Sequence, residues 1–378
     1  MKKFAYSEPC LDEEDKKAVL EVLNSKQLTQ GKYSLLFEEA LCEFLGVKHA
    51  LAFNSATSAL LTLYRNFSEF SADCNEIITT PISFVATANM LLESGYKPVF
   101  AEVKNDGNID ELYLEKLITK KTKAIVSVDY AGKSVEIESI QRLCKKHSLS
   151  FLSDSSHALG SEYHHKKVGG FALASVFSFH AIKPITTAEG GAVVTNDSGL
   201  HEKMKSFRSH GMIKKDFFEG EVKSVGYNFR LNEIQSALGL SQLKKAPLLR
   251  QKREEIALVY DEIFKDNPYF TPLHPLLKHQ SSNHLYPILM RQKFFTCKKL
   301  ILESLHKLGI LAQVHYKPIY QYQLYQQLFN TAPLKSVQDF YNAEISLPCH
   351  ANLDLESVQN IAHGVLKTFE GFNRMSSV

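Results

Sequence analysis

The sequence predicts an α/β protein in which helices cover a mostly parallel sheet on both faces, followed by a smaller α+β domain. Short apolar runs alternate with helix-period stretches between about residues 48 and 210, as is typical of parallel strands joined by helices. After Pro272 the pattern becomes mixed. Because 378 residues exceed one simple core, we expect a large domain at 1–245, including an N-terminal arm, and a small domain at 246–378.

The expected elements follow from hydrophobic periodicity and from helix stop signals. In the large domain we expect strands at 51–53, 77–78, 98–101, 124–128, 150–153, 176–179 and 192–195, with helices at 56–65, 84–93 and 137–147. Farther along the chain we expect helices at 232–244, 250–264, 297–308 and 355–369, with strands at 285–290 and 311–314. Ligands of such sheets bind at the carboxyl ends of the strands, so functional side chains are sought there.

The composition is that of an ordinary globular protein and excludes several classes of function. Apolar residues make up 44% of the chain and charged residues 22%, which is enough to bury a large core. The net charge of +3 is weak and no basic stripe occurs, so we expect no nucleic-acid partner. Without a signal peptide or a run of about 18 apolar residues, no membrane association is expected. Six scattered cysteines without a CxxC pair fit a cytoplasmic protein and predict no metal site.

The turn after the first strand, Asn54 to Ser58, suits a phosphate group. It contains no GxGxxG fingerprint, which argues against a nicotinamide-binding Rossmann domain. Its small hydroxyl residues stand at a helix start, where backbone N–H groups and the helix dipole favour an anion. Taken alone, this pattern favours simple N-capping by Ser55 or Thr57.

Three further residues would complete a site for pyridoxal 5′-phosphate (PLP). An enzyme that uses PLP needs a lysine for the Schiff base, a carboxylate at the ring nitrogen, a binding site for the phosphate and a flat group that covers the ring. Lys183 stands between an apolar strand and the pair Gly190-Gly191. Asp154 ends the strand at 150–153, and Phe84 follows the strand at 77–78. Taken singly, these residues could be a surface lysine, a turn cap and a core aromatic. Their order along the chain favours PLP chemistry.

Six blocks of sequence resemble the DegT-type sugar aminotransferases, a branch of the fold-type I PLP enzymes. The blocks are Leu28–Gly31, Phe53–Leu60, Asp154–Gly160, Ser178–Lys183 with Glu189–Ala192, Gly226–Glu233 and His315–Pro318. The resemblance implies an aspartate-aminotransferase-like fold with a mainly parallel seven-stranded sheet. Two departures stand out: Ser55-Ala56-Thr57 replaces the frequent Asn-Gly-Thr, and His157 stands where Gln is usual. No family role is therefore carried over to His157.

The resemblance also implies roles for individual residues. Lys183 and Asp154 are the catalytic pair. The cofactor-binding residues implied are Ala56, Thr57, Phe84, Asp154, Ser178, Lys183 and, from the neighbouring subunit of a homodimer with shared sites, Asn228. The substrate-binding residues implied are Tyr6, Lys26, Gln27, Leu28, Thr29, Ala56, Ser178, Asn228, Gln313, Val314, His315 and Tyr316. From the residues alone, Tyr316 could also be a half-buried strand aromatic.

The function implied is transfer of an amino group from L-glutamate to C4 of a UDP-linked 4-keto-6-deoxy N-acetyl hexose in pseudaminic acid biosynthesis. Pyridoxamine phosphate would carry the amino group, and 2-oxoglutarate would leave. Alternatives are another nucleotide-linked keto sugar (dTDP or GDP, C3 or C4), a PLP sugar dehydratase and a non-catalytic regulator. Family dehydratases have His at the lysine position, so Lys183 argues against a dehydratase. Lys183 and Asp154 together argue against a non-catalytic regulator.

Overall fold

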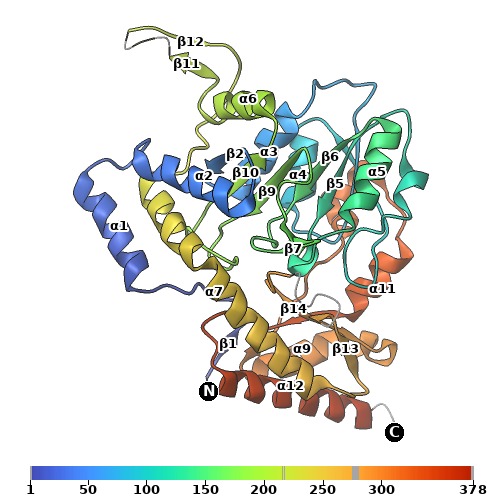
Figure 1. Cartoon of the computed structure of the whole chain (residues 1–378). Helices are drawn as coiled ribbons and strands as arrows, with labels where there is room; N and C mark the ends of the chain where they lie inside the picture. The colour runs from blue at the N-terminus through green and yellow to red at the C-terminus, as the bar shows by residue number, and fades with distance from the viewer. Residues whose placement is uncertain (1, 215, 217, 275–280, 376–378) are drawn as a thin grey trace.

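The computed structural model describes residues 2–214, 216, 218–274 and 281–375. Figure 1 shows an upper part built around a large sheet and a lower part that holds both ends of the chain. Helix α7 (Glu233–Phe264) runs from the upper part into the lower one. The expected domain boundary at 245 thus falls inside a helix, and the division at that residue stays a prediction.

A seven-stranded sheet forms the centre of the upper part, in the order β2-β10-β9-β6-β5-β3-β4. Its strands are β2 (His49–Phe53), β3 (Glu76–Thr79), β4 (Lys97–Phe100), β5 (Thr122–Val128), β6 (Ser150–Asp154), β9 (Ala174–Ser178) and β10 (Gly191–Thr195). Neighbouring strands pair in parallel from β4 to β9. Strand β10 is antiparallel to both β2 and β9, because residues 179–190 return the chain without a crossover helix. The prediction of a mostly parallel sheet is confirmed.

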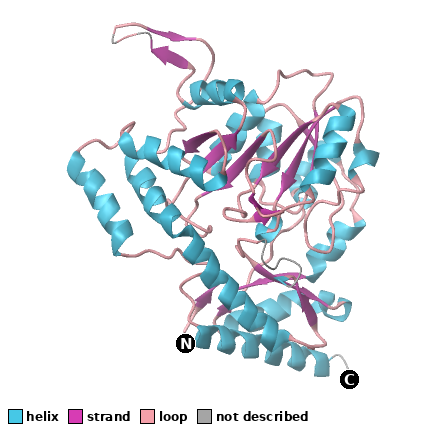
Figure 2. Cartoon of the chain, in the orientation of Figure 1, coloured by secondary structure: helices cyan, strands magenta, loops and turns pink. Residues whose placement is uncertain are grey.

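Helices cover both faces of this sheet (Figure 2). They are α2 (Lys32–Leu45), α3 (Ala56–Asn66), α4 (Ala86–Glu93), α5 (Ile137–His147), α6 (Ser198–Arg208) and the first half of α7. Successive strand residues point to opposite faces. In β6, Leu152 packs with Leu60 of α3, whereas its neighbour Phe151 packs with Ile140 of α5. This alternation explains why the middle of a sheet strand reads as consecutive apolar residues.

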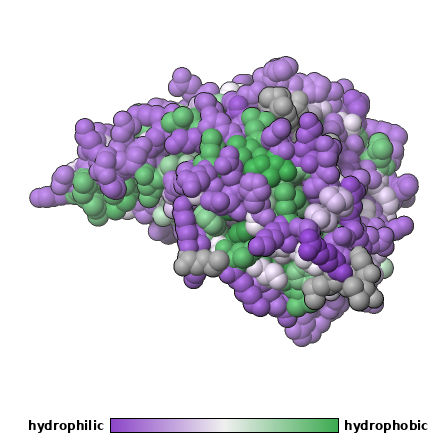
Figure 3. Space-filling model, turned by 90° about the horizontal axis from the view of Figure 1, so that it is seen from below, coloured by the Kyte–Doolittle hydropathy of each residue, from purple (hydrophilic) through white to green (hydrophobic). Residues whose placement is uncertain are grey.

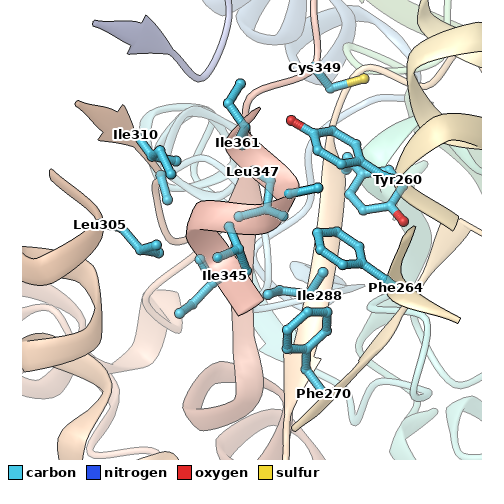
Figure 4. Packing of buried hydrophobic residues seen from close by; sticks show 14 of the residues in the cluster. Tyr260, Phe264, Phe270, Ile288, Leu305, Ile310, Ile345, Leu347, Cys349 and Ile361 are labelled. Carbon is cyan, nitrogen blue, oxygen red and sulfur yellow. The ribbon is translucent and has the colours of Figure 1, made fainter. Parts of the chain in front are cut away.

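The lower part is a second packing unit with an antiparallel sheet, β13 (Phe270–Pro272), β14 (Tyr286–Met290) and β16 (Glu344–Leu347). Its helices are α9 (Lys298–Lys307), α11 (Lys335–Ala343) and α12 (Leu355–Met375), whereas Tyr325 of α10 (Gln323–Phe329) packs in one core with Phe100 of the upper part. Near the N-terminus, β1 (Phe4–Ala5) pairs in parallel with β15 (Ile310–Leu311). Figure 4 shows the buried rings of Tyr260 and Phe264 from α7 beside Phe270 and Ile288 of this sheet.

The remaining elements are short or peripheral. They are α1 (Glu13–Ser25), the hairpins β7 (Glu162–Tyr163) with β8 (Lys166–Lys167) and β11 (Met212–Lys214) with β12 (Gly220–Val222), and the 3-10 helices Leu114–Leu117, Tyr130–Gly132, Gln292–Cys297 and Ile319–Gln321. Hairpin β11–β12 projects from the top of the molecule (Figure 1). Helix α1 lies along α7, where Asp15 accepts hydrogen bonds from Ser241, Gln242 and Lys245.

Three expected elements are wrong in detail. The helices at 232–244 and 250–264 are one helix, α7, which continues through Pro247. Its buried residues lie on both sides of this proline, in the upper and lower cores, and their packing outweighs the lost backbone hydrogen bond. The helix expected at 84–93 begins at Ala86, after the exposed Phe84.

The strand expected at 311–314 is also wrong, since β15 ends at Leu311. The N–H of Ala312 turns back to the carbonyl of Ile310, at 2.9 Å. The N–H of His315 donates to a side chain, the Glu344 carboxylate, at 2.7 Å. Between them, Gln313 pairs with Ser346 through two backbone hydrogen bonds of 3.0 and 2.8 Å, so this part of the expected strand is an isolated bridge that its neighbours interrupt.

The surface gives no sign of a membrane segment within the described ranges, where no helix is both long and apolar enough to cross a bilayer. Seen from below, the molecule is mainly hydrophilic, with a hydrophobic region near the middle of the view (Figure 3). The expected cytoplasmic location stays a prediction.

Candidate active site

A cavity of about 550 Å³ lies at the carboxyl edge of the large sheet. Val128, Asp154 and Ser178 line it, and each is the last residue of its strand, β5, β6 or β9. Tyr6 near the N-terminus and His315 from the lower part line it as well. The cavity therefore lies where the two packing units meet, and its volume is in the range of small-molecule sites, about 300–1,000 Å³.

One end of the cavity is the start of helix α3. Ser55 caps this helix by accepting the N–H of Ser58 on its Oγ at 3.1 Å. Ala56 and Thr57, the first helical residues, line the cavity, and N–H groups in a first turn have no partner within the helix. Gly191 allows β10 to pass close by, since a Cβ there would lie 2.5 Å from the Ala56 nitrogen. This end of the cavity can hold an anionic group.

The carboxylate of Asp154 is buried and held by three donors. Thr87 Oγ1 donates to Oδ2 at 2.7 Å, while the N–H and Oγ of Ser156 donate to Oδ1 at 3.2 and 2.5 Å. Thr87 Oγ1 in turn lies 2.7 Å from Ser83 Oγ. An ionised carboxylate only accepts hydrogen bonds, so this set of donors both satisfies Asp154 and fixes its orientation in the cavity.

Lys183 stands on the loop that connects β9 with β10, and its side chain is half-buried. Burial lowers the pKa of Lys183 to about 8, and the negative charge of Asp154 opposes part of this effect. Its Nζ lies 3.4 Å from Nε2 of His284, a buried residue just before β14. A lysine with a lowered pKa is more often neutral near physiological pH, and the neutral amine is the nucleophile.

Two histidines pack beside this lysine. The rings of His157 and His284 are 4.4 Å apart, and Tyr316 Oη lies 3.0 Å from His157 Nε2. Burial, together with the charge of Lys183, keeps the pKa of both histidines well below the usual value. Among the described residues, neither ring's buried Nδ1 has a hydrogen-bond partner. Buried polar atoms of this kind are expected where a polar ligand belongs.

These residues fit pyridoxal 5′-phosphate. The cavity combines an amine of lowered pKa at Lys183 with a fixed carboxylate at Asp154 and a helix N-terminus beside Ser178. These groups match the covalent, ring-nitrogen and phosphate contacts of the cofactor. Aromatic side chains also face the cavity, and the rings of Phe84 and Tyr316 lie 6.5 Å apart, edge to face.

The structure brings part of the predicted site together. The predicted residues that line the cavity are Tyr6, Ala56, Thr57, Phe84, Asp154, Ser178, Lys183, His315 and Tyr316. The predicted residues outside its lining are Lys26, Gln27, Leu28, Thr29, Asn228, Gln313 and Val314. Of the second group only Val314 is half-buried, and the others are exposed. The roles of both groups stay predictions.

Sequence reasoning missed several residues of the cavity. Ser83 lies in the loop before α4 and Thr87 in its first turn, and no local pattern marked either of them. Ser156 is part of the block around Asp154 but received no role. His284 contacts Lys183 from outside the lining of the cavity, 101 residues later in the chain, and no local pattern connects the two.

Comparisons with known proteins agree with this geometry. The model of the DegT/DnrJ/EryC1/StrS aminotransferase family matches residues 9–366. A Helicobacter pylori protein named UDP-4-amino-4,6-dideoxy-N-acetyl-beta-L-altrosamine transaminase is 90% identical over 372 residues, which are 98% of this chain and 99% of that protein. A Campylobacter jejuni protein of the same name, from strain 81-176, is 44% identical over 370 residues, 97% of this chain and 98% of the relative.

Solved structures share the fold over the whole chain. Helicobacter pylori PseC, an aminotransferase involved in the biosynthesis of pseudoaminic acid, matches with a TM-score of 0.97 and 90% identity, covering 98% of this chain and all of that one. The sugar aminotransferase Spr1654 from Streptococcus pneumoniae, solved in its PMP form, matches with a TM-score of 0.92 and 28% identity over the full length of both chains. The predicted aminotransferase fold is confirmed, and the chain belongs to the DegT/DnrJ/EryC1/StrS aminotransferase family.

Proposed function

We propose that this aminotransferase moves the amino group of L-glutamate to C4 of a UDP-linked 4-keto-6-deoxy N-acetyl hexose. The product is then UDP-4-amino-4,6-dideoxy-N-acetyl-β-L-altrosamine. The observation that carries the proposal is the 90% identity, over 98% of the chain, to the Helicobacter pylori protein named for this product. Aminotransferases of this family use PLP. When bound, PLP acts as an electron sink for the carbon that loses its proton.

Lys183 both attaches the cofactor and moves the proton in this proposal. Its Nζ would hold the cofactor covalently. With an amino substrate bound in that place, the free Nζ would remain in the cavity as the base that takes up a proton from carbon and the acid that returns it. A pKa of about 8 suits this exchange, because an acid–base group works best when its pKa lies near the operating pH.

Asp154 keeps the proton on the ring nitrogen of the cofactor. Thr87 and Ser156 support this role, since their donors hold the carboxylate in one orientation at the end of β6. A charge that is already oriented stabilises the reacting state without reorganisation. Phe84, which is exposed at the mouth of the cavity, covers the ring.

The phosphate and the substrate occupy opposite sides of the cavity. The backbone N–H groups of Ala56 and Thr57 and the Ser178 hydroxyl hold the phosphate, by the anion preference of a helix N-terminus. Tyr6 and His315 face the sugar from the lower part. Burial and the charge of Lys183 lower the pKa of His315 to about 3. The imidazole that faces the substrate is therefore uncharged.

A homodimer with shared active sites completes the proposal. Residues 26–29 and Asn228 are exposed and lie outside the lining of the cavity in their own chain. In a dimer they can reach the cavity of the partner copy. Lys26 and Arg230 in these segments then supply cations for the diphosphate of the nucleotide.

The substrate assignment is tested by product analysis. With PLP, L-glutamate and the UDP-linked 4-keto sugar, the purified protein is expected to release 2-oxoglutarate and a sugar nucleotide with nitrogen in place of the keto oxygen, detected by mass spectrometry. GDP- and dTDP-linked 3-keto and 4-keto sugars serve as controls. A dTDP-linked 3-keto sugar aminated at least about tenfold faster, in kcat/KM, would contradict the substrate but leave the aminotransferase assignment intact.

A further inference from the structure

A buried carboxylate that the proposed reaction does not use lies behind His315. Glu344, the first residue of β16, is fully buried. Its Oε2 accepts the backbone N–H of His315 at 2.7 Å. Its Oε1 accepts the hydroxyl proton of Ser346, two residues along the strand, at 2.6 Å. Glu344 thus binds the segment that carries His315 to the small sheet.

Ser346 connects this carboxylate with the imidazole of His315. Ser346 Oγ lies 2.9 Å from His315 Nδ1. A serine hydroxyl has one proton to donate, and ionised Glu344 can only accept. Because Ser346 donates its proton to Glu344, its oxygen has only lone pairs to offer to Nδ1. Nδ1 must therefore carry the proton of this contact.

The other ring nitrogen follows from the charge state. Burial and the positive charge of Lys183 lower the pKa of His315 to about 3, so its ring is neutral and carries one proton. With that proton on Nδ1, Nε2 has a free lone pair. Since His315 lines the cavity, this lone pair is available to a ligand bound there.

We propose that Glu344, acting through Ser346, holds His315 in the tautomer with its proton on Nδ1, so that Nε2 accepts a hydrogen bond from a hydroxyl or amide N–H of the sugar. Glu344 and Ser346 are positioning residues, and His315 is the residue that touches the substrate. The substrate contact rests on the proposed function, whereas the tautomer does not.

The surroundings of Glu344 supply donors and a counter-charge for its ionised form. Burial raises the pKa of Glu344 to about 7, and the charge of Lys298 on α9 with the hydrogen bonds from Ser346 and His315 opposes this rise, so the carboxylate is ionised at mildly alkaline pH. Tyr130 donates its hydroxyl proton to the carbonyl oxygen of His315 at 2.7 Å, which fixes the same residue a second time. Glu344 thus has two donors, the Ser346 hydroxyl on Oε1 and the His315 N–H on Oε2.

The substitution Glu344→Gln tests the relay without a change of side-chain size. The His315 N–H needs an acceptor, so the amide oxygen of Gln takes that place and its NH₂ group faces Ser346. Ser346 must then donate to Nδ1, and the proton of His315 moves to Nε2. Nitrogen NMR of the ¹⁵N-histidine-labelled holoenzyme distinguishes the two tautomers. The His315 signals are identified by their loss in His315→Gln.

The wild type at mildly alkaline pH is expected to show Nδ1–H, and Glu344→Gln is expected to show Nε2–H. Wild-type Nε2–H, or the same tautomer in both proteins, would overturn the proposal. This measurement involves no sugar, so it separates a failure of the relay from a failure of the proposed substrate.

A second variant pair tests the substrate contact without touching the carboxylate. Ser346→Ala is expected to raise the KM for the keto sugar about tenfold, as for the loss of one hydrogen bond, with the KM for glutamate within about twofold of wild type. Ser346→Thr retains the hydroxyl and should restore the wild-type KM. An unchanged sugar KM in folded Ser346→Ala, or equal losses for both substrates, would show that Ser346 does not position His315 for the sugar.

Discussion

The lowered pKa of Lys183 gives the protein a pH signature that can be measured before any turnover. Burial shifts the pKa of this amine from 10.5 to about 8. At pH 7 the neutral fraction of Lys183 is therefore about one in ten, against roughly one in three thousand for an exposed lysine, a ratio of about 300. Since only the neutral amine attacks the aldehyde of PLP, the rate of attachment should rise with pH and level off above about 8.

Asp154 provides the internal control for this reasoning. Its negative charge raises the pKa of Lys183 and opposes the effect of burial. Asp154→Asn removes that charge while the burial remains. The midpoint of the rate profile should therefore move below the wild-type midpoint.

The assay mixes cofactor-free protein rapidly with excess PLP across a range of pH and follows visible absorbance. Lys183→Ala should form no covalent adduct. Lys166→Ala, at an exposed lysine, should behave as the wild type does and serves as the matched control. A wild-type midpoint near that of a free lysine, or a midpoint that moves upward in Asp154→Asn, would refute the argument.

Three more predictions concern turnover, assembly and stability. Asp154→Asn should keep the wild-type circular dichroism and lose several orders of magnitude in kcat, for a lost electrostatic contribution of about 3–5 kcal/mol; a loss under about threefold would contradict its role. Mixing inactive Lys183→Ala and Asn228→Ala protomers should restore activity, because one site of each heterodimer is then intact, whereas a verified heterodimer without activity would count against shared sites. Phe264→Ala should lower the free energy of unfolding in urea by about 3–5 kcal/mol, whereas the exposed Leu300→Ala should change it little.

The large sheet could be predicted from the sequence because its strands are buried on both faces. In β5, residues 124–128 are all buried and four of the five are apolar, so this run is visible in the sequence without any partner. Asp154 and Lys183 could be predicted for a related reason. Asp154 ends β6 and Lys183 follows β9, and the strand ends of a parallel sheet meet at one edge. Local pattern and tertiary placement agree at these positions.

Other features depend on contacts that no local pattern encodes. Helix α7 continues through Pro247 because the upper core holds it on both sides of the proline, at Ala246 and Leu249, and the lower core holds it from Ile256 onward. The Glu344–Ser346–His315 contacts join β16 to a segment about 30 residues earlier in the chain. Residues 26–29 and Asn228 lie outside the lining of the cavity in their own chain. A single sequence does not show whether a residue acts in its own chain or in a partner chain.

The most direct test of the central claim is to locate the cofactor. The claim is that the cavity between the two packing units is the active site and that Lys183 carries PLP. Borohydride reduction of the resting protein, followed by proteolysis and tandem mass spectrometry, should find the phosphopyridoxyl group on Lys183. The same group on any other lysine, or no modified peptide from a protein saturated with PLP, would contradict the account.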